Sequence, residues 1–395
     1  MSSGDVLSDR VVIAVDPHKA SWTAAVVNSS LQPLARLRVP VSAAGYQQLR
    51  RFADRWPQAS WAIEGAGGLG APLAIRLCGD GIAVMDVPAK LAARVRLLST
   101  GHGRKNDDAD AISVGVAALT APGLHTVALD DAVLALRALV DHRDELVKTR
   151  TQTLNRLHGL LTQLVPAGAP TGLTADTAAH LLHTVRPQTP MLATLRALAS
   201  DLITEIRRLD RRITATATKI TTAIQASGST LTQLHGIGNL LAGKILARVG
   251  NISRFRSAAA FASYTGTAPI EVSSGDVIRH RLSRAGDRQL NSCLHIMAIT
   301  QIHHDTPGRA YYQRKRAAGK SHREALRCLK RQLSDAVYRR LLRDAQPDVK
   351  TGPGGHQGAT PISSAAGSTP TTDSSDKSLS EPVGTDPTNP TPRST

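Results

Sequence analysis

The sequence predicts three structured regions: an α/β N-terminal domain, a helical coiled-coil connector and a mainly α-helical C-terminal domain. Residues 11–130 alternate short apolar runs with helix-like segments, the pattern of a mixed-sheet α/β domain. In residues 131–225, leucine and isoleucine recur at or near heptad distances with charges between them. Residues 226–345 are helical in pattern and strongly basic, and residues 346–395 form a Ser-, Thr-, Pro- and Gly-rich tail that we expect to be disordered.

The composition is that of a globular protein with a polyanionic partner. Of 395 residues, 41% are hydrophobic, and 48 Lys and Arg against 31 Asp and Glu give a net charge of +17. Nucleic acid is the simplest partner for that charge, and a basic surface that serves solubility is the alternative. Three widely spaced cysteines exclude a disulfide framework and a cysteine-only zinc site. We therefore expect a reducing cytosol. The polar residues 1–10 predict no secretory signal, and the longest charge-free stretch, residues 111–129, is a poor membrane span because it contains Gly115, Pro122, Gly123 and His125.

The N-terminal elements follow from apolar runs separated by turn residues. Three strands joined by short turns come first, and alternating helices and strands follow. The strands are expected at residues 11–16, 22–27, about 35–39, 60–64 and 82–87. The helices are expected at residues 43–52, 71–78, 89–98 and from about Asp107. This order predicts a mixed sheet.

The pattern of the connector allows two interpretations, and the basic region has one expected role. Pro166, Gly168, Pro170 and Gly172 interrupt the heptad pattern, so it predicts a helical hairpin. The hairpin is either a coiled-coil dimerisation element or a plain linker packed on its own domain. Residues 276–345 carry 16 Lys and Arg against 6 Asp and Glu, which makes them the expected phosphate-contacting surface.

Four carboxylates occupy positions where α/β folds place their ligands. Asp16 ends the first strand and Glu64 ends the fourth. Asp107 and Asp110 open a helix three residues apart and share one face, whereas Asp108 points elsewhere and is interpreted as a helix-start charge. Each of these carboxylates, taken alone, is typical of a turn or a helix cap. Together they would repel one another without a cation, and oxygen ligands suit Mg²⁺ or Mn²⁺, which activate phosphoryl groups.

Two segments of the C-terminal region indicate a function less specifically than the four carboxylates do. Gly236-Ile237-Gly238 precedes a helix at residues 240–249, and its backbone N–H groups either hold a DNA phosphate or form a simple helix connection. Gly250 is expected to end that helix. Ser273-Ser274-Gly275 follows Pro269 in a loop, and from the residues alone such a serine is seldom a nucleophile.

These motifs resemble the DEDD transposases of bacterial insertion sequences (insertion-sequence family one-ten). The resemblance rests on Asp16 in VDPHK, Glu64 in IEGAGG, Asp107 and Asp110 in KNDDADA, and on the blocks LHGIGNLLAGKILARVGNISRFRSAAAFASYTGTAPIEVSSG and SRAGDRQLN. The resemblance spans about residues 11–345, and the N-terminal and C-terminal motifs occur in the same order as in that family. It implies an RNase H-like (RuvC-like) fold for the N-terminal domain.

The resemblance also implies a mechanism and partners. Asp16, Glu64, Asp107 and Asp110 would hold Mg²⁺. Ser274, which aligns with the catalytic serine of that family, would attack a DNA phosphodiester and form a serine-linked intermediate. A structured bridge RNA would pair with donor and target DNA, and the working unit would be a tetramer built from dimers.

Two other functions are compatible with parts of the sequence. A metal-dependent, structure-specific nuclease of the Holliday-junction resolvase type would use the carboxylates and water, and the Ser274-Gly275 pair argues against it. A catalytically idle nucleic-acid-binding protein would have no need of the four carboxylates.

Overall fold

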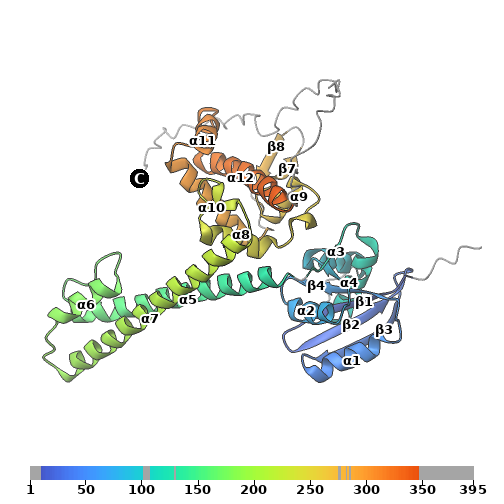
Figure 1. Ribbon diagram of the computed structural model, residues 1–395, viewed down its shortest axis with the longest axis horizontal. Coiled ribbons are helices and arrows are strands. Elements are labelled where there is room, and N and C mark those ends of the chain that lie inside the picture. Colours follow the sequence, from blue (N-terminus) through green and yellow to red (C-terminus); the bar gives the residue numbers. More distant parts are fainter. Residues whose placement is uncertain are drawn as a thin grey trace, which may run out of the picture. The chain divides into compact units, whose positions relative to one another are not determined.

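The computed structural model describes residues 10–100, 107–128, 130–274, 277–281, 283 and 286–346 (Figure 1). Apart from Gln346, the tail expected at residues 346–395 lies outside these ranges. The chain forms two compact units, which meet in sequence between Leu134 and Ala135. Within the described ranges, no helix combines the length and the hydrophobicity that a membrane span requires.

The N-terminal unit contains a six-stranded mixed sheet in the order β3-β2-β1-β4-β5-β6. β2 pairs antiparallel with both β1 and β3, and β4 pairs parallel with both β1 and β5. The strands are β1 (Val12–Pro17), β2 (Ser21–Val27), β3 (Pro33–Pro40), β4 (Ser60–Glu64), β5 (Val84–Val87) and β6 (His125–Thr126). The expected mixed sheet of the N-terminal domain is confirmed, and the two-residue β6 is an addition that the sequence did not predict.

Helices cover both faces of this sheet. They are α1 (Ala43–Ala53), α2 (Ala71–Gly79), α3 (Ala89–Thr100) and α4 (Asp107–Thr120). Because side chains of a strand alternate between faces, Ile13 and Val15 of β1 join the core with α1 and α2. Val12 and Ala14 point to the other face and join a core with α3 and α4. β1 is therefore buried along its whole length.

α4 approaches the sheet closely because it carries a glycine where it crosses β1 and β2. A Cβ atom on Gly115 would lie 2.5 Å from Val27 Cγ2 and 3.3 Å from Ala14 Cβ. A larger residue must therefore push α4 away from the strands, and such overpacking is destabilising. The close approach also fixes how deeply the first turn of α4 sits over the sheet.

We expect Gly115→Ala to lower the free energy of unfolding by about 1–3 kcal/mol, although alanine favours helices. The matched control is Gly159→Ala in the second unit, where nothing lies within 4 Å of the added Cβ. That variant gains helix propensity without a clash and should be more stable by about 0.5–1 kcal/mol. Thermal or urea unfolding of both variants measures the difference, and an equal gain at both positions would contradict the close approach.

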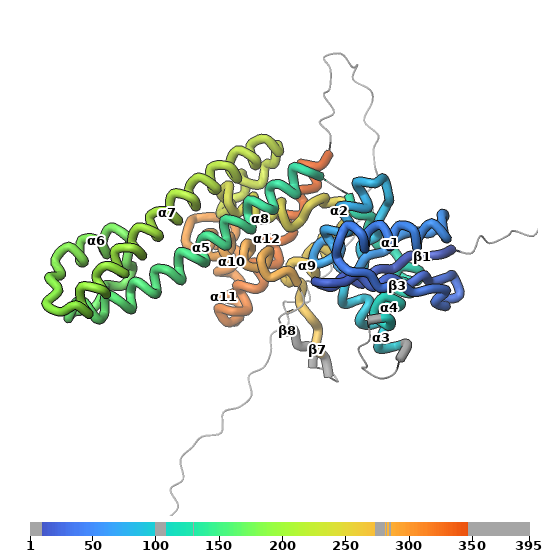
Figure 2. Tube along the Cα trace, turned by 90° about the horizontal axis from the view of Figure 1, so that it is seen from below, coloured from blue at the N-terminus to red at the C-terminus, as the bar shows by residue number. Residues whose placement is uncertain are grey.

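The second unit begins within the first of three helices, which are α5 (Asp131–Leu164), α6 (Ala175–Thr184) and α7 (Pro190–Ala226). α5 and α7 lie side by side, and α6 packs at the end where α5 finishes (Figure 2). α6 begins just after the Pro- and Gly-rich interruption at residues 166–172, and the sequence did not predict this helix between the two long ones. Its capping box at Thr174 and Thr177 explains why a helix starts after that Pro- and Gly-rich stretch.

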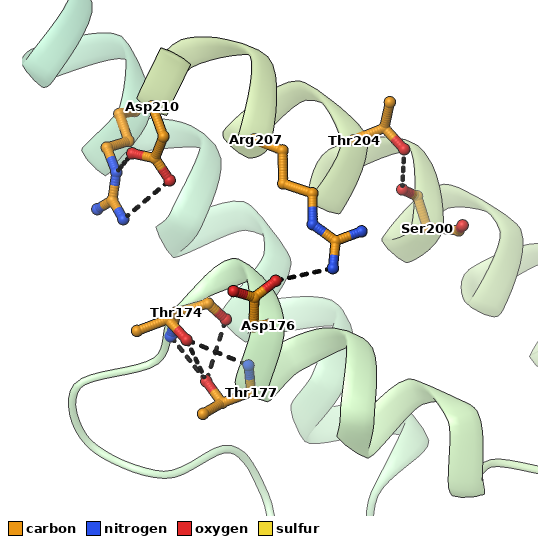
Figure 3. A network of polar contacts seen from close by, with 8 residues as sticks. Thr174, Asp176, Thr177, Ser200, Thr204, Arg207 and Asp210 are labelled. Carbon is orange, nitrogen blue, oxygen red and sulfur yellow. Dashed lines mark hydrogen bonds and ion pairs between the residues drawn. The ribbon is translucent and has the colours of Figure 1, made fainter. Parts of the chain in front are cut away.

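Ion pairs tie these three helices together (Figure 3). Arg150 of α5 binds Asp210 of α7, and Arg207 of α7 binds Asp176 of α6, with 2.8 Å between nitrogen and oxygen. At the opposite end, Leu136 and Ile220 from α5 and α7 belong to the core of the C-terminal helices. The long helices are thus packed at both ends within their own unit. Their proposed use in dimerisation stays a prediction.

The remaining elements surround that C-terminal core. They are α8 (Asn239–Val249), α9 (Ala258–Tyr264), β7 (Ile270–Ser274), β8 (Val277–Arg281), α10 (Arg288–His303), α11 (Pro307–Ala317) and α12 (His322–Asp344), with short 3₁₀ turns at Leu231–Gln233 and Ile252–Arg254. The region is mainly helical, as expected. It also contains the β7–β8 hairpin, which the sequence did not predict.

Candidate active site

Asp16 and Glu64 occupy neighbouring positions at the carboxyl ends of two parallel strands. The paired residues of β1 and β4 end with Val15 opposite Ile63, and Asp16 and Glu64 are the next residues of these strands. Ala14 and Ala62 belong to the α4 face of the sheet, and Asp16 and Glu64, two residues further on, project to that same face. Asp16 is buried, at 7% exposure, and Glu64 is half-buried.

Asp110 faces the same core from the covering helix. It precedes Val114 and Ala117 at helical spacing, and both of these contact the core that contains Ala14. The Asp110 side chain is 5% exposed and forms an ion pair with Arg96 of α3. Asp107 is the first residue of α4, and its side chain is outside the described part of the structure.

Two of the nearby polar residues have clear partners. Asp108 forms an ion pair with Arg36 of β3 at 3.2 Å, which agrees with its interpretation as a helix-start charge outside the site. His18 Nε2 lies 3.2 Å from Asp16 Oδ2. His18 therefore contacts a predicted metal ligand.

Sequence reasoning missed Asp86 on β5. Its Oδ1 accepts a hydrogen bond from the backbone N–H of Ala66 at 2.7 Å, two residues after Glu64. The N–H of Gly65, which has a φ of 58°, donates to the Val87 carbonyl at 2.9 Å. These bonds hold the turn after β4 and thereby orient the end of the strand that carries Glu64. A carboxylate inside the apolar run of residues 82–87 was the available signal.

The described side chains contain no group of three His, Cys, Asp or Glu residues that could hold a metal ion. Asp107 is not among those side chains. The structure thus brings Asp16 and Glu64 to one edge and Asp110 to the covering helix, and the four-carboxylate site remains a prediction.

Ser274 is the last residue of β7, where it pairs with Val277 of β8. The sequence placed it in a loop. The strand forms because Ile270, Val272, Val277 and Ile278 supply β-branched residues on both sides of a short Gly-Asp connection. The side chains of Ser273 and Ser274 lie outside the described part of the structure.

The base of the β7–β8 hairpin is held by the residues of the SRAGDRQLN block. A Cβ on Gly286 would lie 2.2 Å from the backbone nitrogen of Gly266, so the two segments touch through glycines. Asn291 Nδ2 donates to the carbonyls of Thr265 and Gly266 at 2.9 and 3.1 Å, and Lys330 Nζ donates to Asn291 Oδ1 at 2.5 Å. Burial lowers the pKa of Lys330. The motif therefore positions the strand that ends in Ser274.

Close packing explains why the turn before α8 contains a glycine at position 236. Gly236 has a φ of 88°, and a Cβ there would lie 3.1 Å from the Met297 carbonyl oxygen. Gly238 caps α8 without any side-chain hydrogen bond. Gly250, with a φ of 59°, ends the helix as expected. The turn is compatible with both of its interpretations, a phosphate contact and a helix connection.

Exposed basic side chains are concentrated on α11 and α12. This basic surface consists of Arg309, Arg314, Arg316, Arg323, Arg327, Arg339 and Arg343, all of them exposed. Tyr311 is half-buried on α11, and Arg314 lies 5.8 Å from its ring centroid. Guanidinium groups spread along two helices provide the contacts that a nucleic-acid backbone needs.

Two protein-family models match this chain. Residues 13–166 match a transposase model of the DEDD, IS110 type, and residues 228–313 match the model for the transposase IS116/IS110/IS902 family. The first match contains Asp16, Glu64, Asp107 and Asp110. The second contains Ser274.

Individual proteins are similar over most of the chain. The insertion element IS110 uncharacterized 43.6 kDa protein of Streptomyces coelicolor is 30% identical over 312 residues, which cover 67% of this chain and 76% of that protein. The IS116 uncharacterized 44.8 kDa protein of Streptomyces clavuligerus is 27% identical, covering 87% and 98% of the two chains. Among solved structures, Thermus thermophilus RuvC matches at 15% identity and a TM-score of 0.24, over 30% of this chain and 99% of that one.

Proposed function

Because this chain belongs to the IS116/IS110/IS902 family, it is an insertion-sequence transposase that cleaves and joins DNA, and we propose a metal- and serine-dependent mechanism for it. In this mechanism, the N-terminal unit supplies a divalent metal site and the C-terminal unit supplies the nucleophile. The observation that carries the proposal is the shared sheet edge, where Asp16 and Glu64 lie at the carboxyl ends of adjacent parallel strands on the face covered by the helix that begins at Asp107.

The donor set at this edge fits a hard divalent cation. Asp16, Glu64, Asp107 and Asp110 offer carboxylate oxygens, the ligands that Mg²⁺ and Mn²⁺ prefer. Asp16 and Asp110 are buried, and buried carboxylates require a compensating charge. A bound Mg²⁺ would supply Lewis-acid activation of the phosphoryl group. The four carboxylates would hold the ion and fix its position against the sheet.

Ser274 is the proposed nucleophile. Its Oγ would form a bond to the phosphorus of a DNA phosphodiester, while the bond from phosphorus to one deoxyribose oxygen breaks and that oxygen takes up a proton. The hydroxyl of a second strand would then attack the phosphoserine and release the serine unchanged. This exchange conserves the number of phosphodiester bonds, so the joined strand needs no other energy source.

The proposed partners are donor DNA, target DNA and a structured bridge RNA, with dimers that assemble to a tetramer. The basic surface on α11 and α12 supports nucleic-acid binding because phosphate contacts dominate the affinity of such complexes. The surface is compatible with either DNA or RNA. The guide function therefore needs a test of its own.

We expect recombination to depend on the RNA. The protein is expressed with the DNA that flanks its gene, the RNA that copurifies is sequenced, and purified protein is mixed with donor and target duplexes and Mg²⁺. Joined products should form with this RNA and fall to background with a scrambled RNA of equal length. Equal joining after RNase treatment would exclude RNA guidance, and cleaved ends without joining would favour a resolvase-type nuclease.

A further inference from the structure

Asp110 is bound by an arginine from a neighbouring helix. Nη1 of Arg96 on α3 forms an ion pair with Asp110 Oδ1, and the two side chains are 23% and 5% exposed. A carboxylate this deeply buried is unfavourable without a counter-charge, because burial removes its hydration. Arg96 supplies that charge in the structure described here. Its guanidinium thus contacts an oxygen that the proposed function assigns to a metal ion.

We propose that Arg96 is an internal counter-ion that competes with the divalent metal for Asp110. The inference rests on the proposed metal site. When the metal-free protein folds, Arg96 neutralises Asp110. When a divalent cation binds, Asp110 exchanges the guanidinium for the metal, since two cations held at one buried carboxylate would repel each other strongly. Arg96 therefore stabilises the metal-free protein and weakens its affinity for the metal.

The surroundings of Arg96 allow this exchange. Leu97 and Leu98, which follow it on α3, are 58% and 88% exposed, so this part of the helix is not enclosed by other described residues. The Arg96 side chain is itself partly exposed, and a rotamer change would move the guanidinium towards water. Asp110, held on α4 by the Gly115 contact with the sheet, is the fixed partner of the pair.

Metal titration of the full-length chain tests the competition. Binding of MnCl₂ and of MgCl₂ is measured by isothermal titration calorimetry for the wild type, Arg96→Gln and Arg94→Gln. Arg94 is exposed on the same helix, so its variant loses the same charge without losing the ion pair. If Arg96 occupies Asp110 in nine-tenths of the metal-free molecules, Arg96→Gln should bind metal about tenfold more tightly than Arg94→Gln.

Each outcome decides the inference. Equal or weaker metal affinity of folded Arg96→Gln relative to Arg94→Gln would overturn it and leave the metal site standing. Absence of metal binding by the wild type would overturn the metal site and the inference together. Hydrogen–deuterium exchange of the wild type is independent of any variant. Added Mg²⁺ should speed exchange in the peptide that contains Arg96, and unchanged or slower exchange would contradict the release of the arginine.

Discussion

Ser274→Ala is expected to abolish strand transfer, whereas Ser273→Ala should retain most of it. Without the hydroxyl, no covalent bond to the phosphate can form, and water in its place would release a free end that cannot be rejoined. A hydrolytic enzyme that uses the carboxylates and water would lose little from the same change. The two serines are neighbours on β7, so Ser273→Ala is a control with the same chemistry at almost the same place.

The decisive measurement is covalent trapping. A nicked or suicide DNA substrate is incubated with the protein, Mg²⁺ and the copurified RNA, then denatured and resolved for protein-linked DNA. The adduct should map to Ser274 by peptide mass and disappear in Ser274→Ala. An active Ser274→Ala variant that yields free cleaved ends and no adduct would exclude the serine mechanism.

Asp16→Asn and Glu64→Gln should each lower strand cleavage by about a hundredfold or more, the scale of losing one electrostatic contributor in an active site. Each substitution removes a negative charge from the sheet edge and keeps the size of the side chain. DNA and RNA affinity should stay near the wild-type value, because the basic surface lies on α11 and α12. Cleavage assays and filter binding on the same preparations separate the two effects.

Asp108→Asn provides the matched control. Asp108 lies on α4 close in sequence to the proposed ligands, yet its partner is Arg36 on the surface of β3. Such exposed ion pairs contribute little to stability, so this variant should cleave DNA at the wild-type rate. Wild-type recombination by Asp16→Asn or Glu64→Gln would refute the metal assignment. An equally large loss in Asp108→Asn would show that any charge change at this edge is harmful.

Local sequence patterns were sufficient to predict most of the helices and strands. The strand expected at residues 60–64 is β4 to the residue, and the helix expected at 43–52 differs from α1 by one residue at its end. These agreements arise because apolar periodicity and caps act within a few residues of each other. The two-residue β6 escaped prediction because it exists through its pairing with β5, forty residues earlier in the chain.

The sequence by itself determined the family, the mixed-sheet fold of the N-terminal domain and the short list of acids and serines proposed to act on DNA. Those features reside in the order of motifs and in local spacing. The tertiary structure alone decided that Asp86 braces the turn after Glu64, that Asn291 and Lys330 hold the base of the hairpin ending in Ser274, and that Arg96 binds Asp110. The reason is physical: a polar side chain takes whichever partner packing brings within hydrogen-bond reach, and the spacing of residues along the chain does not specify contacts between separate elements.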